Sequence, residues 1–464
     1  MERSKRRLAI VVGLFLVLFL GLVLYLVFFQ LVKAPELRAN SMNMRNWVDE
    51  THFGRGRFYD RNGQELVGRE KDEDGEYYRY SNHPNMYSHL IGYHSGLYGK
   101  TGLEKALNSE LLNLSSDNPI AALRGTVLNE GTGNDAVLTI DNDLQYCAYS
   151  AMEGHKGAAI AMDVKTGEIL AMVSLPSFNV NDVDEYWNEL IEDEGDVLFP
   201  RATLGRYTPG SVIKPITALA LLSQGVDLNY EDKGQTTVDG KRYTNAGEAA
   251  YGEIGLKEAL MHSSNVYFID KTKNMDPSAL RQAMESVGFN KELPFLLPTA
   301  KSTADYKEGM DVNLKVSDSF GQGDVLVTPL QMTVAYAAFA NGGKVLEPHI
   351  VKNFLTPAGE EIKPTKPNVL NQISASHAAI LREDLIATGD TIGLSDALGQ
   401  SAGGKTGTAE TANNSTNAWT IGFAPAEDPR VVVCVVLEDD GRSGGEAALP
   451  VVAEILSQAL ATQE

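Results

Sequence analysis

The sequence is poor in cysteine, and that shortage excludes several classes of protein. Its only two cysteines, Cys147 and Cys434, lie far apart and show neither metal-ligand nor redox spacing. A disulfide-stabilised scaffold or a cysteine-based metal site is therefore not expected. We interpret both residues as small apolar side chains in the interior, each with a free thiol.

Basic residues are also scarce outside the N-terminus. Four of the 40 lysines and arginines lie in the first seven positions beside one acid, which leaves 36 basic and 60 acidic residues thereafter, a formal charge of −24. Such an acidic surface repels nucleic acid and anionic lipid headgroups. No nucleic-acid partner is expected, and any anionic ligand needs a local cluster of cations or dipoles.

One apolar run, residues 8–29, is long enough to cross a membrane. It contains 22 consecutive uncharged positions, about 33 Å as a helix, and no convincing cleavage site follows it. We therefore expect an uncleaved transmembrane anchor rather than a signal peptide. The basic cluster before it predicts a single-pass protein of the cell membrane, with residues 1–7 in the cytoplasm and residues 30–464 outside.

The exterior divides into two units. Residues 30–134 mix short apolar runs with glycine, asparagine and aspartate, which predicts a small β-rich spacer module. A strand, a turn at Asn62-Gly63 and a second extended piece open it. Residues 135–464 have strands followed by helices at both ends. They predict an α/β domain of the α+β type, with a mostly antiparallel sheet flanked by helices.

Several elements of the second unit can be placed. Residues 157–162 and 168–174 predict a hairpin, and residues 418–425 and 430–438 predict two further strands. We expect a helix at about residues 450–461. Another helix begins at Pro329, with Thr328 as its cap and Gln331 completing a capping box, and ends at Gly342-Gly343.

The triplet Lys-Thr-Gly occurs three times, and its context separates the three copies. Lys100-Thr101-Gly102 precedes an amphipathic helix and is interpreted as a helix start. Lys165-Thr166-Gly167 lies between two strands and is interpreted as a hairpin turn. The third, Lys405-Thr406-Gly407, also ends a match to the phosphate-binding loop pattern at residues 399–406. No buried strand precedes that match and no helix follows it, so we consider the match accidental.

A helix beginning after Pro209-Gly210 carries the strongest candidate nucleophile. Ser211 lies in its first turn, and Lys214 lies on the same face one turn later. A serine hydroxyl needs a base to remove its proton, and a lysine can serve once burial or a nearby cation lowers its pKa. Ser263-Ser264-Asn265 and the third triplet with Thr408 follow in order, the signature of penicillin-recognising serine enzymes.

The third triplet also suits carboxylate binding by residue type alone. Gly407 has no side chain, so a substrate could lie against the strand edge as an added β-strand. Thr406 and Thr408 point to one side and, with Lys405, could form a cationic, hydroxyl-lined site. His262 precedes Ser263, but we interpret it as a packed or solvated histidine rather than a catalytic partner.

The chain resembles the class B penicillin-binding proteins, in particular those similar to penicillin-binding protein A, here with a short N-terminal module. Besides the three motifs, the resemblance includes RGRFYDRNG, LTIDNDLQ, DVKTGEILAMVSLPSFN, SFGQGDVLVTPLQM and AWTIGFAP, from about residue 55 to the end. It implies a fold like that of serine β-lactamases and transpeptidases. One departure is Pro200-Arg201-Ala202, where the family often has Asn-Arg-Ala.

The resemblance implies a peptidoglycan D,D-transpeptidase that needs no metal or cofactor. In such an enzyme Ser211 becomes acylated by a stem peptide ending in D-Ala-D-Ala, Lys214 is its base, and Ser263 with Lys405 protonates the leaving D-alanine. The remaining implied roles are substrate-amide binding by Asn265, carboxylate binding by Lys405, Thr406 and Thr408, and an oxyanion hole from the backbone N–H groups of Ser211 and Thr408. The implied partners are β-lactams and a membrane glycosyltransferase, since this chain cannot build glycan itself.

Two alternatives remain. A β-lactamase or β-lactam sensor shares these motifs, but class A hydrolases add a deacylating glutamate, and no Glu-x-x-Leu-Asn occurs between Asn265 and Lys405. An inert cell-wall scaffold would not need intact Ser211, Lys214 and Ser263. A cross-linking enzyme is the interpretation that the sequence favours.

Overall fold

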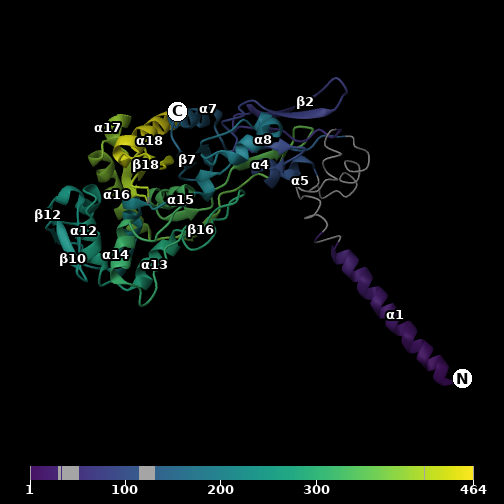
Figure 1. The fold of residues 1–464 in the computed structure, drawn as a ribbon, viewed down its shortest axis with the longest axis horizontal. Helices are drawn as coiled ribbons and strands as arrows, with labels where there is room; N and C mark the ends of the chain where they lie inside the picture. Colours follow the sequence, from purple (N-terminus) through teal and green to yellow (C-terminus); the bar gives the residue numbers. More distant parts are fainter. Residues whose placement is uncertain (1, 30–32, 34–51, 114–130, 412, 463–464) are drawn as a thin grey trace.

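The computed structural model describes residues 2–29, 33, 52–113, 131–411 and 413–462. They form an N-terminal helix, α1 (Glu2–Phe28), and a folded body that contains one five-stranded and one six-stranded sheet (Figure 1). Of the predicted spacer module, residues 30–32, 34–51 and 114–130 lie outside the described residues.

The five-stranded sheet is antiparallel throughout, with the strand order β17-β18-β19-β7-β8. Its central strand β19 reads VVVCVVL, a β-branched run that suits a strand buried on both faces. Side chains of β19 alternate between two hydrophobic clusters, with Val433 in one and Cys434 in the other. The strands are β7 (Gly157–Asp163), β8 (Ile169–Leu175), β17 (Gly403–Glu410), β18 (Thr416–Ala424) and β19 (Val431–Leu437).

Helices cover both faces of this sheet, which makes it the middle of three layers. On one face lie α7 (Asn142–Ala151) and α18 (Gly444–Ala461), which share a hydrophobic cluster with Val433. On the other face α15 (Pro329–Ala340) is buried along its whole length. An antiparallel sheet flanked by helices is thus confirmed.

Further helices extend the α15 side of the sheet and carry most of the polar motifs. Small two-stranded sheets, β9 with β12 and β10 with β11, lie at the far end of this region (Figure 1). Its elements are α9 (Arg201–Leu204), η3 (Gly210–Ile213), α10 (Lys214–Gln224), β9 (Tyr230–Asp232), β10 (Gln235–Val238), β11 (Lys241–Thr244), η4 (Ala246–Glu248), β12 (Gly252–Ile254), α11 (Leu256–Met261), α12 (Asn265–Thr272), α13 (Pro277–Ser286), α14 (Val312–Phe320) and α16 (Ala375–Thr391). Helix α17 (Leu394–Leu398) lies on the opposite face, where Leu394 belongs to the hydrophobic cluster of α7 and α18.

The second sheet has the order β15-β14-β6-β1-β2-β3 and joins distant parts of the chain. β1 pairs in parallel with β6, and β6 pairs antiparallel with β14, so the sheet crosses the predicted boundary between residues 134 and 135. Its strands are β1 (Phe58–Tyr59), β2 (Glu65–Lys71), β3 (Tyr77–Ser81), β6 (Asp135–Leu138), β14 (Val351–Leu355) and β15 (Glu361–Ile362). The remaining elements are β4 (His94–Ser95), β5 (Gly99–Lys100), α4 (Gly102–Ala106), α5 (Asn108–Leu111), η2 (Val180–Asp182), α8 (Val183–Glu192), β13 (Lys344–Leu346) and β16 (Val369–Gln372).

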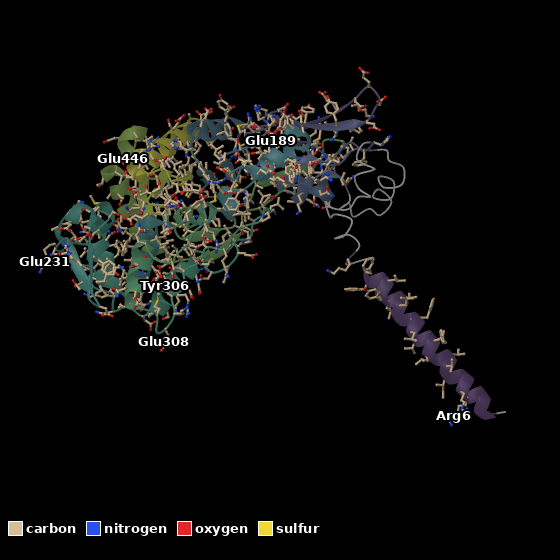
Figure 2. All side chains as sticks on the ribbon, in the orientation of Figure 1. Arg6, Glu189, Glu231, Tyr306, Glu308 and Glu446 are labelled. Carbon is tan, nitrogen blue, oxygen red and sulfur yellow. The ribbon has the colours of Figure 1, made fainter. Side chains whose placement is uncertain are left out.

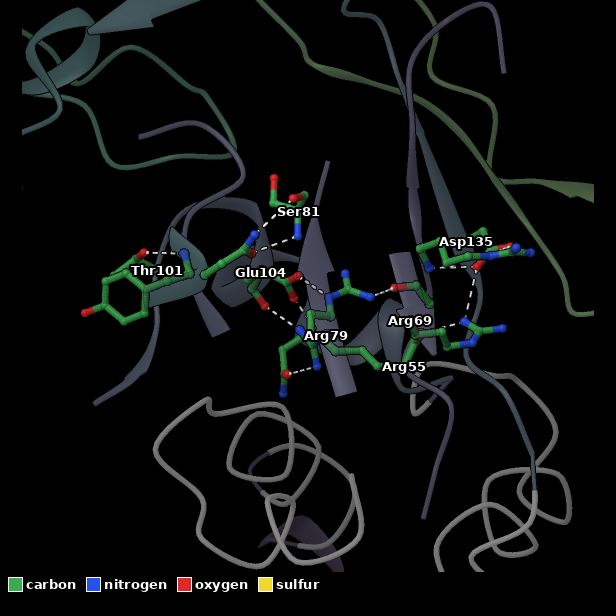
Figure 3. Close-up of polar contacts among 12 residues, drawn as sticks. Arg55, Arg69, Arg79, Ser81, Thr101, Glu104 and Asp135 are labelled. Atoms are coloured by element: carbon green, nitrogen blue, oxygen red, sulfur yellow. Dashed lines mark hydrogen bonds and ion pairs between the residues drawn. The ribbon is translucent and has the colours of Figure 1, made fainter. Parts of the chain in front are cut away.

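A buried ion network lies beside this sheet (Figure 3). Glu104 is 1% exposed and accepts hydrogen bonds from Arg55 Nε at 2.7 Å and Arg79 Nε at 2.5 Å. Burial alone would raise the pKa of Glu104, but the two guanidinium groups outweigh it and hold the pKa at about 2. The carboxylate therefore binds β3 to α4 and to the chain before β1.

The C-terminal helix begins earlier than predicted. Instead of starting near Pro450, α18 starts at Gly444 because Ser443 and Glu446 form a capping box, with each side chain bound to the other residue's backbone N–H. Pro450 lies inside the helix. At α15, Thr328 caps as predicted, but the Gln331 side chain donates to Val287 O, so the predicted capping box does not close.

Both cysteines are free, as predicted, but only Cys434 is fully buried. Burial raises the pKa of the Cys434 thiol to about 12 and that of the partly exposed Cys147 to about 11. Neither thiol is poised for nucleophilic chemistry, because the thiolate is the reactive form.

The described side chains of α1 project around an uncovered helix (Figure 2), with Phe15 and Val17 both 69% exposed. Among the helices of the described residues, none meets the combined length and hydropathy that a membrane crossing requires. The transmembrane anchor predicted for residues 8–29 is not confirmed and stays a prediction.

Candidate active site

The segment that carries Ser211 is fixed from two sides. Ser211 lies in the short 3-10 helix η3, half-buried, and α10 continues from Lys214. Tyr336 Oη donates to Val212 O at 2.8 Å, and Trp419 Nε1 donates to Thr208 O at 3.1 Å. Side chains from α15 and β18 thus hold the backbone on either side of the hydroxyl.

Lys214 is fully buried next to the second motif. Its Nζ lies 2.6 Å from Ser263 O, 2.8 Å from Asn265 Oδ1 and 3.2 Å from Ser263 Oγ. Burial lowers the pKa of Lys214 well below 10.5, and the nearby Lys405 lowers it further. The neutral amine that a general base requires is therefore favoured.

Ser263 lies in the tight connection between α11 and α12. Its φ of +53° is uncommon for a residue with a side chain. The next residue, Ser264, caps α12 by accepting from Tyr267 N at 3.0 Å and donates to the buried Asp232 at 2.6 Å. The contacts of Ser264 thus fix the turn, and the Ser263 hydroxyl faces the two lysines.

Lys405 reaches the same hydroxyl from the sheet. Its Nζ lies 3.0 Å from Ser263 Oγ and 3.0 Å from Thr406 O, and the side chain is 1% exposed. Burial lowers the pKa of Lys405 to about 7. Ser263 Oγ therefore lies between two amines whose pKa values are both lowered by burial.

A cavity of about 270 Å³ opens over these groups. Among the predicted residues, Ser211, Ser263, Asn265 and the stretch Thr406–Thr408 line it, while Lys214 and Lys405 lie beneath and bind Ser263. The structure thus brings together all eight predicted site residues. Asn265 is already held, because its Nδ2 donates to Thr244 O at 3.2 Å while its Oδ1 accepts from Lys214.

Strand β17 lies at the edge of the five-stranded sheet, with one side free of a partner strand. Thr406 and Thr408 share one face, as predicted, but Lys405 and Gly407 face the other way. Gly407 also has a packing role that the sequence did not reveal. A Cβ added there would lie 2.9 Å from Pro209 O and 3.1 Å from Val212 N, so its absence lets η3 pack against β17.

Four further residues line the cavity and were not predicted as site residues: Ala246, His262, Phe320 and Gln322. Gln322 Nε2 donates to Thr408 O at 3.3 Å, and the His262 ring stacks on Tyr251 with 4.4 Å between centroids. The stretch SFGQG, which contains Phe320 and Gln322, was part of the family resemblance and could have identified two of them. Nothing local identified Ala246.

The other two Lys-Thr-Gly copies have the structural positions that their context predicts. Lys165-Thr166-Gly167 forms the β7–β8 turn, in which Asp163 Oδ1 accepts from the backbone of Lys165 and Thr166. Gly102 opens α4 directly after Thr101. At residues 399–406, Lys405 and Thr406 lie inside strand β17 rather than at a helix start, which excludes a phosphate-binding loop.

The departure at Pro200-Arg201-Ala202 leaves the local backbone well anchored. Pro200 occupies the N-cap of α9 and makes no side-chain cap there. Arg201 is buried, with Nε donating to Glu438 Oε2 at 3.0 Å and Nη2 donating to Gly195 O at 2.8 Å. Ala202 N donates to Ser174 Oγ at 3.0 Å, so β8 holds the segment in place. In the described part of the chain no cluster of three His, Cys, Asp or Glu residues could hold a metal ion.

Comparison with known proteins finds similarity over almost the whole chain. Residues 157–457 match the penicillin binding protein transpeptidase domain, and residues 55–135 match the penicillin binding protein A dimerisation domain. The peptidoglycan D,D-transpeptidase PbpA of Mycolicibacterium smegmatis is 30% identical over 99% of both chains, and that of Mycobacterium tuberculosis is 29% identical over 99% of both.

Solved structures of a D,D-transpeptidase domain and of a penicillin-binding protein are also similar to this chain. The D,D-transpeptidase domain of a peptidoglycan glycosyltransferase from Eggerthella lenta is 32% identical, with a TM-score of 0.79 over 89% of this chain and 99% of that one. Penicillin-binding protein A from M. tuberculosis, as a ceftriaxone acyl-enzyme complex, is 28% identical, with a TM-score of 0.83 over 89% of this chain and 100% of that one.

Proposed function

The chain belongs to the penicillin-binding protein transpeptidase family, and on that premise we propose that it cross-links peptidoglycan through an acyl-enzyme on Ser211. It is a serine-type D,D-transpeptidase and a target of β-lactam antibiotics. One observation supports the residue roles above all others. The Nζ atoms of Lys214 and Lys405 both lie within hydrogen-bond distance of Ser263 Oγ, beneath the cavity that Ser211 lines.

Lys214 is the base for acylation. A neutral lysine has two N–H groups and one lone pair. Ser263 O and Asn265 Oδ1 can only accept, so they take both N–H groups and leave the lone pair for a hydroxyl proton. Ser211 gives its proton to that lone pair while its Oγ bonds to the carbonyl carbon between the two D-alanines.

Collapse of the tetrahedral intermediate then expels the terminal D-alanine. Its nitrogen takes a proton from Ser263, which recovers one from Lys405 across the 3.0 Å contact. The acyl group stays on Ser211 until an amine of a second stem peptide attacks the ester. That attack forms the amide cross-link and breaks the ester to Ser211. Lys214 returns its proton to Ser211 Oγ, and the proton lost by the amine passes through Ser263 back to Lys405.

The backbone N–H groups of Ser211 and Thr408 form the oxyanion hole. Their two segments lie in close contact, because a Cβ added to Gly210, which has a φ of +56°, would lie 2.7 Å from Thr408 O. Thr406 and Thr408 bind the terminal carboxylate with Lys405. The donor peptide adds as a strand along the free edge of β17.

Mass spectrometry of the penicillin-treated protein tests this assignment. We expect one acyl group on the peptide that contains Ser211, lost in Ser211→Ala and retained in Ser223→Ala, a matched change on α10. Acylation of another serine in the Ser211→Ala protein would move the nucleophile and overturn the proposed roles.

Residues 8–29 anchor the enzyme in the cell membrane, with the N-terminus in the cytoplasm and the catalytic domain outside. The 22 uncharged positions and the preceding basic cluster support this orientation. We expect the full chain to sediment with membranes and to resist extraction by high salt. Recovery in the soluble fraction, or at a mass lacking the first 30 residues, would refute the anchor.

A membrane glycosyltransferase supplies the glycan strands that this enzyme cross-links. The support is chemical, because stem peptides must be carried on polymerised glycan before they can be joined into a network. Reconstitution with a candidate polymerase and lipid-linked precursor tests this. Cross-linked dimers of stem peptides should form only when both enzymes are present, and their formation by this chain alone would contradict the partnership.

A further inference from the structure

A second cavity, of about 450 Å³, lies at one end of the five-stranded sheet. The β7–β8 turn, the end of α15, helix α16 and the loop between β18 and β19 all contribute to it. It shares no lining residue with the active-site cavity. We call it the cationic cavity, and its polar lining consists of Lys165, Asn341, Lys344, Arg382 and Asp428.

Positive charge exceeds negative charge here, in contrast to the chain as a whole at −21. Three cations line the cavity against one carboxylate, Asp428, whose Oδ2 lies 2.8 Å from Lys165 Nζ. That hydrogen bond, with Arg430 and Arg382 nearby, lowers the pKa of Asp428. Among the residues that line the cavity, positive charge therefore exceeds negative charge.

Two of the cations also lack a side-chain hydrogen bond to any described residue, although the charge of Arg382 acts on Asp428. Arg382 Nε is buried and makes no hydrogen bond, although an unsatisfied buried donor is costly. Lys344 is exposed, and its Nζ makes no hydrogen bond or ion pair with any described residue. The backbone beneath is ordered, because the Asn341 side chain binds Val164 O, Lys344 O and Lys344 N.

We propose that the cationic cavity binds an oxyanion, a carboxylate or a phosphate, through Arg382 and Lys344. A planar guanidinium matches the two oxygens of either group, and a lysine adds a point charge. Bacterial wall polymers offer both groups, as stem-peptide carboxylates and as phosphodiesters. Choosing a wall polymer as the source depends on the proposed function, whereas binding of the anion itself does not.

Calorimetric titration of the full-length protein tests the site with two probes, inorganic phosphate and a γ-D-glutamyl dipeptide. Arg382→Gln should weaken binding by about tenfold, and Lys344→Gln by about threefold. The matched control Lys291→Gln removes one exposed positive charge elsewhere and should change affinity by less than about twofold. Melting temperatures without anion verify that each variant is folded.

The two probes separate the sources. Preferential binding of phosphate indicates a phosphodiester, and preferential binding of the dipeptide indicates a stem carboxylate. Binding should persist after penicillin has acylated the protein, which separates this site from the active site and keeps its test distinct from that of the transpeptidase. No binding of either probe, or equal weakening by Lys291→Gln, would overturn the proposal.

Discussion

Ser263 Oγ is the single atom on which the two buried amines converge. Each amine alone loses much of its proton affinity through burial, and the charge of one opposes the charge of the other. Both lysines therefore give up a proton at a lower pH than a free lysine would. That arrangement lets one lysine accept a proton from Ser211 while the other supplies one to the leaving group.

The rate of acylation should consequently pass through a maximum as the pH rises. The base Lys214 must be unprotonated, and burial with the nearby Lys405 lowers its pKa well below 10.5, whereas Lys405, whose pKa burial lowers to about 7, must keep the proton that it supplies through Ser263. We expect the second-order rate constant for penicillin acylation to rise from pH 5.5 toward neutral pH and to fall above about pH 7, as Lys405 loses its proton. A flat profile across this range would contradict a neutral lysine as the base.

Removing Lys405 should shift the pH dependence of the acylation rate. Without its positive charge the pKa of Lys214 rises, so in Lys405→Ala the rising limb should shift upward by about one pH unit, in addition to a lower rate. Stopped-flow acylation at a series of pH values measures both effects. A lower rate with an unshifted limb would mean that Lys405 only positions the substrate.

The acyl-enzyme should also be long-lived. Of the described residues that line the active-site cavity none is a carboxylate, so no side chain there is suited to activating a deacylating water. We expect penicillin to remain bound for tens of minutes or longer, followed by intact-mass spectrometry. Rapid turnover of nitrocefin would instead favour the β-lactamase interpretation.

Among the individual residues, the sequence predicted those whose spacing along the chain is fixed by the chemistry. Ser211 and Lys214 must be one helical turn apart, so their relation is local and visible in the chain. Ala246 reaches the cavity through the packing of distant segments, and Gln322, which the family resemblance contained, does so while bound to Thr408. Such long-range contacts leave no periodic signal in one sequence.

Among the elements, η3 and β17 depend on each other through a glycine. Gly407→Ala would place a methyl group 2.9 Å from Pro209 O, a backbone atom that cannot rotate away. We expect η3 to be displaced, with acylation slowed by about 100-fold and stability lowered by about 1–3 kcal/mol.

A second glycine provides the control. The nearest atom to a Cβ on Gly445 is the Thr406 side chain at 4.0 Å, so Gly445→Ala adds the same methyl group without a clash. Its acylation rate should stay close to that of the unchanged protein. If both variants were equally impaired, close packing at Gly407 would not be the cause.

Element types followed from local patterns better than element ends did. The β7–β8 hairpin and the strand nature of β17 were predictable because alternation and turn residues are local. The start of α18 was not, because Pro450, which resembles a helix start, lies inside a helix that the Ser443-Glu446 capping box begins.

For the molecule as a whole, the buried ion network should dominate the stability of the N-terminal region. Glu104→Gln leaves Arg55 and Arg79 facing a neutral group in the interior and should cost about 3–5 kcal/mol, measured by urea unfolding. Glu110→Gln breaks only a partly exposed pair with Lys363 and should cost less than about 1 kcal/mol. Equal losses of unfolding free energy in the two variants would show that the buried ion pairs of Glu104 stabilise the fold no more than an exposed pair does.

Lowering the pH should reduce the free energy of unfolding for the same reason, because it protonates Glu104. The folded protein holds the pKa of Glu104 at about 2, below its ordinary value of 4.5. Its contribution to stability is therefore complete above pH 4.5 and is lost as the pH falls toward 2. The difference in unfolding free energy between Glu104→Gln and the unchanged protein should accordingly shrink between pH 5 and pH 3, and a constant difference would refute the shift.

The larger architecture was only partly predictable. An antiparallel sheet with flanking helices followed from the order of strands and helices at the ends of the domain. The pairing of β14 with β6 joins residues about two hundred positions apart through short strands, and such pairing has no local signature.

That pairing has a mechanical consequence. Because β14 and β15 lie in the same hydrogen-bonded sheet as β1 to β3, tension applied to the N-terminal segment reaches the catalytic region through a ladder of backbone bonds as well as along the chain. The catalytic region therefore cannot move independently of β1, β2 and β3. The direction in which its cleft faces relative to these strands is set by the fold.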